Sequence, residues 1–285
     1  GIQMLCKQAD IELSEISVIA VDIGPGLFTG MRVGLAAGKA LDIMQTGPVE
    51  GFTTPLHGST DLTRVAGAHL VVIADQAKPQ QGADDLLVLR QIAQLASRAV
   101  ILCAGADGRL LVERGVKELR YGRDRLFGSA PEALAASVRA LVALQTNGSV
   151  RDVALTVLGI PPAHAVVNWD DATIGGFSAT RVLDEPTRRR LGTQVGPLWP
   201  PGPHALAHAA VEAIAAVAGI SRRAISCFVA ADDSTGVRTR AAAMPVRLGL
   251  AGVTSVEAPT LSVAAQVALD NAMLLSGDLE IAVPD

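Results

Sequence analysis

Short apolar runs alternate with segments of helical periodicity along the first half of the chain. The runs at 17–23 (SVIAVDI), 69–75 (HLVVIAD) and 99–105 (AVILCAG) predict buried strands, and residues 84–97 between the last two predict a helix. Near-continuous apolar strands separated by helices are typical of a parallel sheet that is covered on both faces. The pattern therefore predicts an open α/β sheet in this half of the chain.

The pattern changes near residues 124–128, where we place the boundary with an α+β half. Beyond it the periodicity predicts helices at 131–145, 185–195, 203–219 and 263–275, and strands at 152–160, 165–169, 225–230 and 243–248. The last two strands are expected to pair through the polar turn at 232–236. Before the boundary, residues 46–60 are rich in Gly, Thr and Pro and predict a loop.

Composition agrees with an α/β fold and argues against direct nucleic-acid binding. Of 285 residues, 49% are hydrophobic and only 3% aromatic, so a large core is built mainly from Ala, Val and Leu. The net charge of −4 leaves no basic footprint for nucleic acid. The one basic run, Arg188-Arg189-Arg190, follows Asp184-Glu185 and is interpreted as a solvated helix face.

Cysteine usage and the apolar stretches predict a cytoplasmic protein without a membrane contact. Cys6, Cys103 and Cys227 are scattered and offer neither a metal pair nor a disulfide framework, which fits a reducing compartment. The chain shows no signal-peptide pattern. Its longest apolar stretch, about 205–220, is interrupted by His208 and is too short to cross a bilayer.

From Gly38 onward the sequence resembles the lactate/malate dehydrogenase family. The resemblance rests on GKALDIMQTGPVEGF (38–52), GSTDLTRVAGAHLVVIAD (58–75), RLFGSAPEALAASVRALVA (125–143) and AAMPVRLGLAGVTSV (242–256), in the family's order. It implies a partial Rossmann-type parallel sheet at 38–124, followed by an α+β dehydrogenase-like C-terminal domain at 125–285. It also implies an NAD-linked oxidoreductase with a small 2-oxo acid as its partner.

The first 37 residues carry a different pattern. DIELSEISVIAVDIGPGLFTGMRVGLA (10–36) is similar to the TsaB/YeaZ family, which takes part in making threonylcarbamoyladenosine on tRNA. The two resemblances meet at Gly34–Gly38, within a predicted helix at 31–45. Because losing a parallel strand would expose an apolar edge, residues 1–37 are expected to form the first β-α unit, with strand 18–22 paired to 69–73 or another neighbour.

The dehydrogenase resemblance implies a cofactor site at the first strand–helix turns. Glycines there let a pyrophosphate lie against a helix N-terminus, and an acidic residue binds the ribose. The fingerprint G-x-G-x-x-G is missing, since Gly24, Gly26 and Gly30 give only G-x-G-x-x-x-G. The candidate cofactor-binding residues are Asp22, Gly24, Gly26, Ala74, Asp75 and Ala104.

The positions that the resemblance assigns to catalysis carry no suitable side chains. The Asp-x-x-Arg of the substrate-domain helix falls at Leu134 and Ser137, and the histidine that accepts the hydroxyl proton falls at Pro161. Lys78, the sole cation of the loop 74–87, and His164, three residues late, are the remaining candidates, each more simply explained as a solvated loop residue. We therefore predict a dehydrogenase fold with lost or altered catalysis, a pseudoenzyme.

Other polar groups have a structural explanation beside the functional one. His204 and His208 have a metal-compatible i, i+4 spacing, but no third ligand is evident and a helix surface is favoured. Asp170-Asp171 and Asp232-Asp233 could hold a divalent ion, although adjacent acids in turns usually face water, and no metal site is predicted. In NWDDATIGGF (168–177), Trp169 or Asp171 could line a remodelled pocket; a tight glycine turn anchored by Trp169 is favoured.

Three functions remain open from the sequence. The first is an NAD-linked 2-hydroxy-acid dehydrogenase or its descendant. The second is a catalytically silent protein of the same fold that acts by association or ligand sensing, with the Ala-rich helix 206–218 as the surface of a homo-oligomer. The third is an accessory protein in tRNA threonylcarbamoyladenosine modification that acts through protein partners. Tight NADH binding with turnover of a 2-oxo acid separates the first from the second.

Overall fold

The structure, a computed structural model, describes residues 18–21, 56–59, 61–74, 85–230 and 240–275. Several predictions fall outside these residues: the helix at 31–45, the turn at 232–236 with Asp232-Asp233, the glycines Gly24 and Gly26, and the side chains Asp22, Asp75 and Lys78.

Parallel strands form one end of the main sheet. β1 (Val18–Val21) pairs in parallel with β3 (Leu70–Ile73), so the predicted pairing of the first strand is confirmed. On its other side β1 pairs with β2 (Leu56–Ser59), which lies in the segment predicted as a loop. The sequence of β2, LHGS, has no apolar alternation, so its strand conformation depends on pairing with β1 and not on its own pattern.

The next two strands continue the parallel arrangement and are followed by a change of direction. β4 (Val100–Cys103) pairs with β3, and β5 (Leu126–Gly128) pairs with β4. Within the described residues the complete order is β2-β1-β3-β4-β5-β11-β12-β7-β8, with β13 paired to β12. The later strands are β7 (Val157–Ile160), β8 (His164–Val167), β11 (Ile225–Val229), β12 (Ala242–Gly249) and β13 (Gly252–Val256). The mixed α/β fold with a parallel region is thus as predicted.

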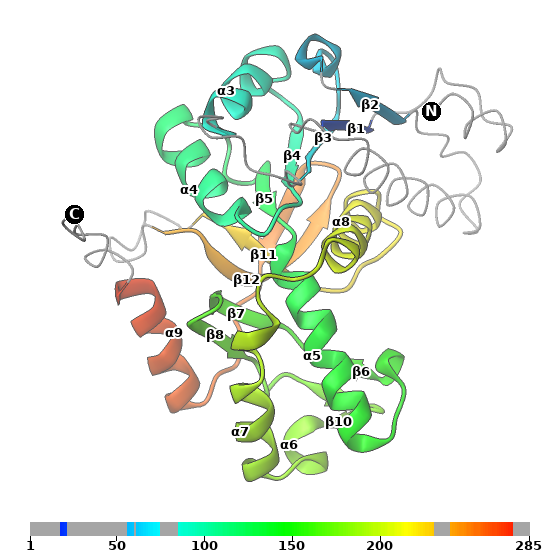
Figure 1. Cartoon of the computed structure of the whole chain (residues 1–285), viewed down its shortest axis with the longest axis vertical. Helices are drawn as coiled ribbons and strands as arrows, with labels where there is room; N and C mark the ends of the chain where they lie inside the picture. The colour runs from blue at the N-terminus through cyan, green and yellow to red at the C-terminus, as the bar shows by residue number, and fades with distance from the viewer. Residues whose placement is uncertain (1–17, 22–55, 60, 75–84, 231–239, 276–285) are drawn as a thin grey trace, which may run out of the picture.

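Helices cover both faces of the parallel strands, as the apolar runs predict. α3 (Asp85–Leu95) and α4 (Gly108–Leu119) lie on one face and α8 (Pro203–Val217) on the other (Figure 1). Alternate residues point to opposite sides because the side-chain period of a strand is two. Val71 and Ile101 accordingly pack with α3 and α4, whereas Val72 and Leu102 pack beneath α8.

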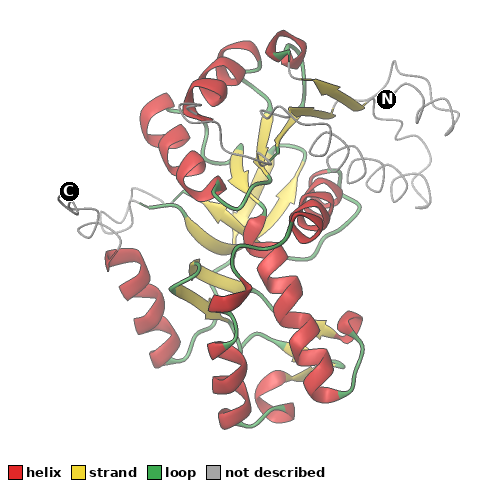
Figure 2. Ribbon diagram, in the orientation of Figure 1, coloured by secondary structure: helices red, strands yellow, loops and turns green. Residues whose placement is uncertain are grey.

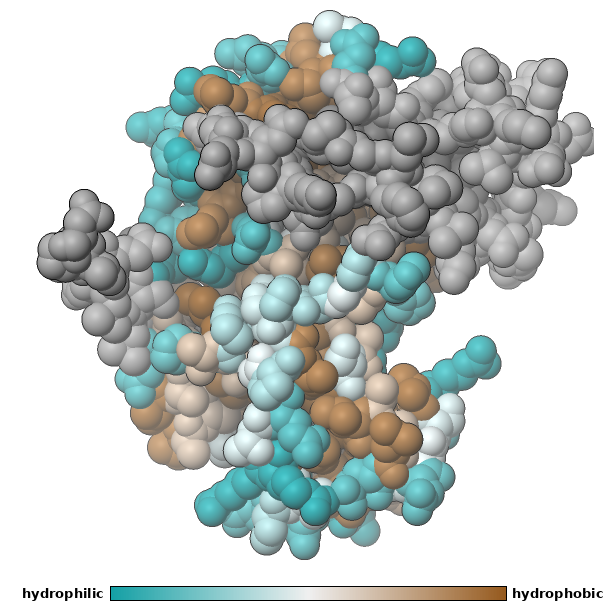
Figure 3. Space-filling view, viewed as in Figure 1, coloured by the Kyte–Doolittle hydropathy of each residue, from teal (hydrophilic) through white to brown (hydrophobic). Residues whose placement is uncertain are grey.

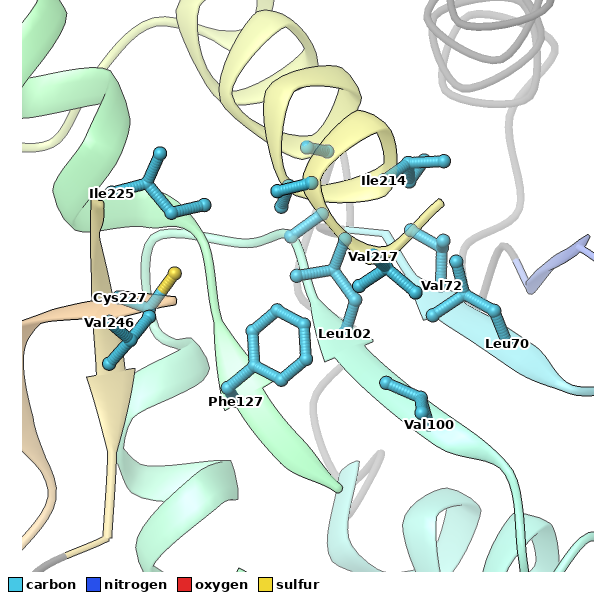
Figure 4. Packing of buried hydrophobic residues seen from close by; sticks show 14 of the residues in the cluster. Leu70, Val72, Val100, Leu102, Phe127, Ile214, Val217, Ile225, Cys227 and Val246 are labelled. Atoms are coloured by element: carbon cyan, nitrogen blue, oxygen red, sulfur yellow. The ribbon is translucent and has the colours of Figure 1, made fainter. Parts of the chain in front are cut away.

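The core beneath α8 joins the parallel and antiparallel parts of the sheet. Ile214 and Val217 of α8 lie over side chains from β3, β4, β5 and two antiparallel strands (Figure 4). Phe127 is fully buried at the centre of this group. Burial of such a side chain contributes about 1.5–3 kcal/mol, so this shared core couples the two halves of the sheet.

Antiparallel strands from the C-terminal part extend the sheet. β11 (Ile225–Val229) pairs with β12 (Ala242–Gly249), as predicted for strands 225–230 and 243–248. β12 also pairs with β13 (Gly252–Val256) and, through Ala243, with β7 (Val157–Ile160). A single bridge, Phe228 to Gly128, connects β11 to the parallel strand β5.

A smaller lobe lies below the sheet and is organised by one helix. α5 (Ala130–Thr146) begins directly after β5 and runs from the sheet into this lobe (Figure 2). Around it lie β6 (Val153–Ala154), β8 (His164–Val167), β9 (Thr173–Ile174), β10 (Phe177–Ser178), α6 (Ala179–Val182) and α7 (Glu185–Thr193). α9 (Val263–Leu275) packs against β7 and β8.

Three details differ from the predictions. The predicted strand 152–160 begins one residue later, after the 3-10 helix Val150–Asp152, and is interrupted at residues 155–156, which separate β6 from β7. His164 is the first residue of β8 and not part of an exposed loop. α4 was not predicted; it is polar on its outer face, where Glu113 pairs with Arg109 and Lys117.

The surface contains both polar and apolar regions. On the face shown in Figure 3, hydrophobic side chains gather over the lower half, among hydrophilic ones. Phe177 of β10 and Leu144 near the end of α5 are exposed by 62% and 75%. Among the described residues, none of the helices has the length and apolarity needed to cross a membrane.

Candidate functional site

The carboxyl ends of β3, β4 and β5 lie side by side and form the candidate site. The amide of Ala104 donates to the carbonyl of Ile73 at 2.8 Å, and the amide of Ser129 donates to the carbonyl of Cys103 at 3.1 Å. These bonds place Ala74, Ala104 and Ser129 in one row just beyond the strands. Ligands of open α/β sheets bind at this edge, so the row is the expected place for a cofactor. We call it the carboxyl edge.

Small residues let the chain pass closely behind this edge. Ala74 and Ala104 are 6% and 8% exposed, and the segment after β4 continues through Gly105 and Ala106 into α4. At Gly108, the first residue of α4, an added Cβ would lie 3.0 Å from the Cβ of Cys103. The tight packing between α4 and β4 therefore depends on a residue without a side chain.

Ser129 is the most unusual polar residue of the carboxyl edge. It is fully buried, and its hydroxyl has no hydrogen-bond partner among the described residues. It precedes α5 without capping it, because its side chain bonds to none of the helix amides. A buried unsatisfied hydroxyl costs about 1–3 kcal/mol, so its presence calls for an explanation other than packing.

The two helix positions implied for Asp-x-x-Arg carry neither its acid nor its arginine. Leu134 is fully buried in the apolar cluster of the lower lobe. The Ser137 hydroxyl donates to the carbonyl of Ala133 at 3.1 Å, one turn earlier in α5. Neither residue offers a positive charge or a planar pair of donors for a carboxylate.

The turn between β7 and β8 holds the position that the resemblance assigns to the proton acceptor. Pro161 is buried there, and the peptide bond that joins it to Pro162 is cis. Gly159 has a φ of +85°, and an added Cβ would lie 2.2 Å from the carbonyl oxygen of His164. His164 is a strand residue that pairs with Ile160 across the β7–β8 hairpin.

Glu132 is the centre of a buried charge network that was not predicted. Its side chain is 2% exposed, and its Oε1 accepts a bond of 2.6 Å from Arg139 and one of 2.9 Å from Arg223. Its Oε2 accepts a bond of 2.8 Å from the amide of Ser226 in β11. The buried carboxylate is therefore paired with three hydrogen-bond donors.

The remaining members of this network extend it to two other elements. Arg139 also donates to the carbonyl of Leu155, at 3.3 Å, and the hydroxyl of Ser226 accepts a bond of 2.9 Å from the amide of Val157. Arg223 reaches Glu212 of α8 at 2.9 Å. The network, defined as Glu132, Arg139, Arg223 and Ser226, therefore joins α5, the start of β7, α8 and β11.

Both described cysteines are buried and poor nucleophiles. Burial, helped by the charge of Asp85, raises the pKa of Cys103 to about 12. Burial and then the neighbouring Glu132 carboxylate raise the pKa of Cys227 well above its usual value. A thiol reacts as its thiolate, so neither cysteine supplies a nucleophile near neutral pH.

The acidic pair Asp170-Asp171 bonds to backbone amides. An Asp171 oxygen accepts a bond of 2.8 Å from the amide of Thr260, and an Asp170 oxygen accepts one of 2.9 Å from the amide of Ser262. Burial raises the pKa of Asp171, but hydrogen bonds from Asn168 and Thr260 outweigh it, so this pKa lies below its usual value. Asp171 thus has a structural role among the described residues, and the pocket-lining role stays a prediction.

The neighbouring residues have the structural role favoured from the sequence. Trp169 is partly buried against the apolar cluster of the lower lobe. The following turn between β9 and β10 uses Gly175 and Gly176, which both have positive φ values, of 58° and 81°. Across the described part of the chain, no group of three or more His, Cys, Asp or Glu residues could hold a metal ion.

The helix suggested as an association surface is largely buried within the chain. α8 buries Ala213, Ile214 and Val217, among others, under its own sheet, which leaves a polar outer face. His204 and His208 are exposed on that face, as favoured from the sequence, with His208 at 3.8 Å from Glu212. The apolar residues of α8 are thus not free for a partner, and the homo-oligomer stays a prediction.

Curated relatives and solved structures similar to this chain share one description. A malate dehydrogenase of Thioalkalivibrio sulfidiphilus is 32% identical over 172 residues, which cover 56% of each chain. Malate dehydrogenases of Chlorobium phaeobacteroides and Desulforudis audaxviator are 26% and 25% identical and are covered to 77% and 89%, with 77% and 90% of this chain matched. The chain is thus similar to malate dehydrogenases over most of its length.

Solved structures agree with this malate dehydrogenase-like fold. The malate dehydrogenase of Aeropyrum pernix matches with a TM-score of 0.71 at 14% identity, over 90% of this chain and 94% of that one. The malate dehydrogenase of Salinibacter ruber matches with a TM-score of 0.68 at 19% identity, over 90% and 93%. The predicted fold class is therefore confirmed.

A second similarity concerns the first residues only. The family model described as "TsaD: tRNA N6-adenosine threonylcarbamoyltransferase" matches residues 2–52. The predicted resemblance of this segment was to the TsaB/YeaZ family, which this match does not specifically show. The segment's similarity therefore points to threonylcarbamoyladenosine enzymes in general terms, and most of it lies outside the described residues.

Sequence reasoning missed the polar residues that matter most in the malate dehydrogenase-like fold. Ser129, Glu132, Arg139 and Arg223 were not singled out, although two signals were present. Ser129 and Glu132 have the S-x-x-E spacing of a capping box, and Glu132 and Arg139 are two turns apart on an otherwise apolar helix. A charged pair on a face expected to be buried indicates a buried ion pair.

Proposed function

We propose that the chain is a malate dehydrogenase-like member of the NAD-linked 2-hydroxy-acid oxidoreductases in which hydride-transfer catalysis is lost or altered. One observation carries the proposal: Leu134, at the position implied for a catalytic-domain acid, lies fully buried in an apolar cluster. Ser137 and Pro161, at the other two implied positions, supply neither a carboxylate clamp nor a proton acceptor. General acid–base help is worth typically 10²–10⁴-fold, so its loss has a measurable consequence.

NAD binding is the part of the family's function that the described residues fit best. The unsatisfied hydroxyl of Ser129 lies at the carboxyl edge, where a polar ligand group would supply its missing partner. Ala74 and Ala104 have short side chains, which would let a ligand approach the backbone at this edge closely. Asp22, Gly24, Gly26 and Asp75 complete the proposed cofactor residues. Bound NAD would supply the hydride acceptor.

The experiment compares binding and turnover in the same preparation. NADH is titrated against the protein by fluorescence, and NADH oxidation is then followed with oxaloacetate and with pyruvate. We expect saturable NADH binding, together with turnover at least about 10²-fold below that of an authentic malate dehydrogenase under the same conditions. Turnover comparable to that enzyme would overturn the proposed loss, and a failure to bind NADH would remove the cofactor from the proposal.

A matched pair of variants tests the assignment of the cofactor edge. Ser129→Ala removes the unsatisfied hydroxyl, whereas Ser137→Ala removes a hydroxyl that bonds within α5. We expect Ser129→Ala to weaken NADH binding and Ser137→Ala to leave it unchanged. Binding without turnover would favour the ligand-sensing alternative over an active dehydrogenase, and light scattering of the same sample measures whether the predicted homo-oligomer forms.

A second candidate function rests on the similarity of residues 2–52 to the TsaD model. In this alternative the chain is an accessory protein in tRNA threonylcarbamoyladenosine modification, and its TsaB/YeaZ-like segment acts through a protein partner. Copurification with the tRNA-modifying ATPase partner, lost on deletion of residues 1–37, would support it. Retention of that partner by the deletion variant would refute it.

A further inference from the structure

α9 is attached to the rest of the molecule by few buried side chains. Leu269, Ala272 and Met273 face the sheet and are 2%, 0% and 8% exposed. On its outer side Val263 and Val267 are exposed by 83% and 52% and gain much less from burial. Only part of this apolar helix therefore contributes hydrophobic stabilisation.

The residues that lead into α9 are fixed by the acidic pair of the lower lobe. Asp171 and Asp170 accept the amides of Thr260 and Ser262, at 2.8 and 2.9 Å. Ser262 in turn starts the helix: its hydroxyl accepts the amide of Ala265 at 3.4 Å, and its carbonyl accepts that of Gln266 at 2.9 Å. The two carboxylates thus hold the beginning of α9 at a site about 90 residues away in the chain.

The carboxylates are themselves held in place by a buried side chain. Asn168 is 1% exposed, and its Nδ2 donates to the same Asp171 oxygen at 2.9 Å. The amide of Asn168 donates to the carbonyl of Thr156, at 3.1 Å. The acceptor is therefore anchored in the core of the lower lobe, and the bond to Thr260 fixes α9 rather than the reverse.

The inner face of α9 supports the turn between β7 and β8. Met273 packs with Ile160, the last residue of β7, and with Ala242 of β12. The Cβ of Ala272 is among the nearest atoms to Gly159, at 3.8 Å from the position of a Cβ there. Pro161 follows Ile160 directly, so the position of α9 determines the support beneath this turn.

We propose that α9 is a strap that opens as a unit, and that the Asp170-Asp171 clasp, the two carboxylates with Asn168, sets how often it opens. In the closed state the strap holds the β7–β8 turn against the sheet. In the open state Met273 of α9 leaves Ile160 and Ala242, which become uncovered, while the main core beneath α8 stays intact. This inference does not depend on whether the proposed function holds.

Hydrogen exchange of the full chain tests the strap. The double variant Asp170→Ala/Asp171→Ala removes both acceptors, and the matched control Asp184→Ala removes a similar exposed carboxylate that accepts the amide of Thr187 in α7. We expect exchange of peptides covering α9 to accelerate at least 10-fold in the double variant. Peptides of α3 and α8 should be unchanged, and the control should accelerate only α7.

Two outcomes would overturn the strap. Unchanged exchange in α9 would mean that the clasp does not limit its opening, and equal acceleration across α3, α8 and α9 would mean that α9 opens only with global unfolding. The isosteric Asp171→Asn variant keeps an acceptor oxygen and should lie between the wild type and the double variant. An effect of Asp171→Asn equal to that of the double variant would contradict a hydrogen-bonded clasp.

Discussion

Two buried polar side chains at the start of α5, Ser129 and Glu132, differ in whether they have hydrogen-bond partners. Ser129 and Glu132 are both buried, yet the hydroxyl of Ser129 has no partner among the described residues, whereas the carboxylate of Glu132 has three donors. Both cost free energy to bury, but only Glu132 recovers it inside the chain. The contrast separates a buried group whose hydrogen bonds are completed within the described residues from one whose hydroxyl is left unpaired there.

The position of each group explains the difference. Glu132 accepts bonds from Arg139 of α5, from Arg223 between α8 and β11, and from the amide of Ser226 in β11, so its bonds join distant parts of the chain. Ser129 lies at the carboxyl edge, where the strands end and where open α/β sheets bind their ligands. One turn of α5 thus separates the structural side of the molecule from its candidate binding side.

The largest effect is expected from Glu132→Ala. Arg139, 7% exposed, would then be left as an uncompensated buried charge, and the amide of Ser226 would lose its acceptor. We expect the free energy of unfolding, measured with urea, to fall by about 3–5 kcal/mol. The control Glu185→Ala removes an exposed ion pair with Arg189 and should cost less than about 1 kcal/mol. Equal losses would show that the network is not special.

Alkaline pH should lower the free energy of unfolding through a buried thiol next to each group. Cys103 accepts the amide of Ser129 on its carbonyl, and Cys227 lies beside Glu132. The folded-state pKa of Cys103 is raised from 9.0 to about 12, so between these values the unfolded chain has released a proton that the folded chain retains. Stability is therefore full below pH 9 and falls above it, by about 1.4 kcal/mol per pH unit for this group. Tyr121, with its pKa raised by burial from 10.0 to about 12, adds to the loss above pH 10.

Urea unfolding at a series of pH values between 7 and 11 measures this slope. Cys103→Ala should make the slope shallower, because its thiol no longer contributes, and Cys227→Ala should do the same beside Glu132. A stability that stays constant from pH 8 to pH 11 would contradict the buried thiols.

A smaller effect of opposite sign is expected from Ser129→Ala. Removal of an unsatisfied buried hydroxyl should raise the free energy of unfolding by about 1 kcal/mol in the absence of any ligand. Ser226→Ala is the matched control, since its hydroxyl accepts the amide of Val157, and it should lower stability by about 1–3 kcal/mol. If both variants were destabilised to the same extent, the contrast between the two regions would be lost.

Periodicity predicted the elements whose burial is simple. The strands β3 and β4 and the helices α3, α8 and α9 lie within the predicted ranges, and α5 extends one residue beyond its range at each end. Apolar runs and helical stripes record which faces are buried. The pairing of β11 with β12 was likewise predicted. β2 was missed because LHGS has no such pattern, and its strand conformation depends on pairing with β1.

The candidate site was less predictable, for a physical reason. The resemblance directed attention to Leu134, Ser137 and Pro161, whereas the polar residues that the fold buries include Ser129 and Glu132. Which donors reach Glu132 depends on Arg223 and Ser226, about 90 residues later in the chain. No local pattern records a contact at that separation. The assignments at Asp22, Gly24, Gly26, Asp75 and Lys78 stay predictions, since these residues lie outside the described structure.

The bond between Glu132 and Ser226 also has a consequence for synthesis of the chain. The two residues are 94 positions apart, so a ribosome adding about 5–20 residues per second needs roughly 5–19 s to supply the partner of Glu132. During that interval α5 can form, but β11 has not yet been synthesised. β11 supplies the Ser226 amide that donates to Glu132, and it connects the antiparallel strands to β5. A nascent chain halted before residue 226 should therefore remain protease-sensitive and become resistant only once β11 has left the exit tunnel.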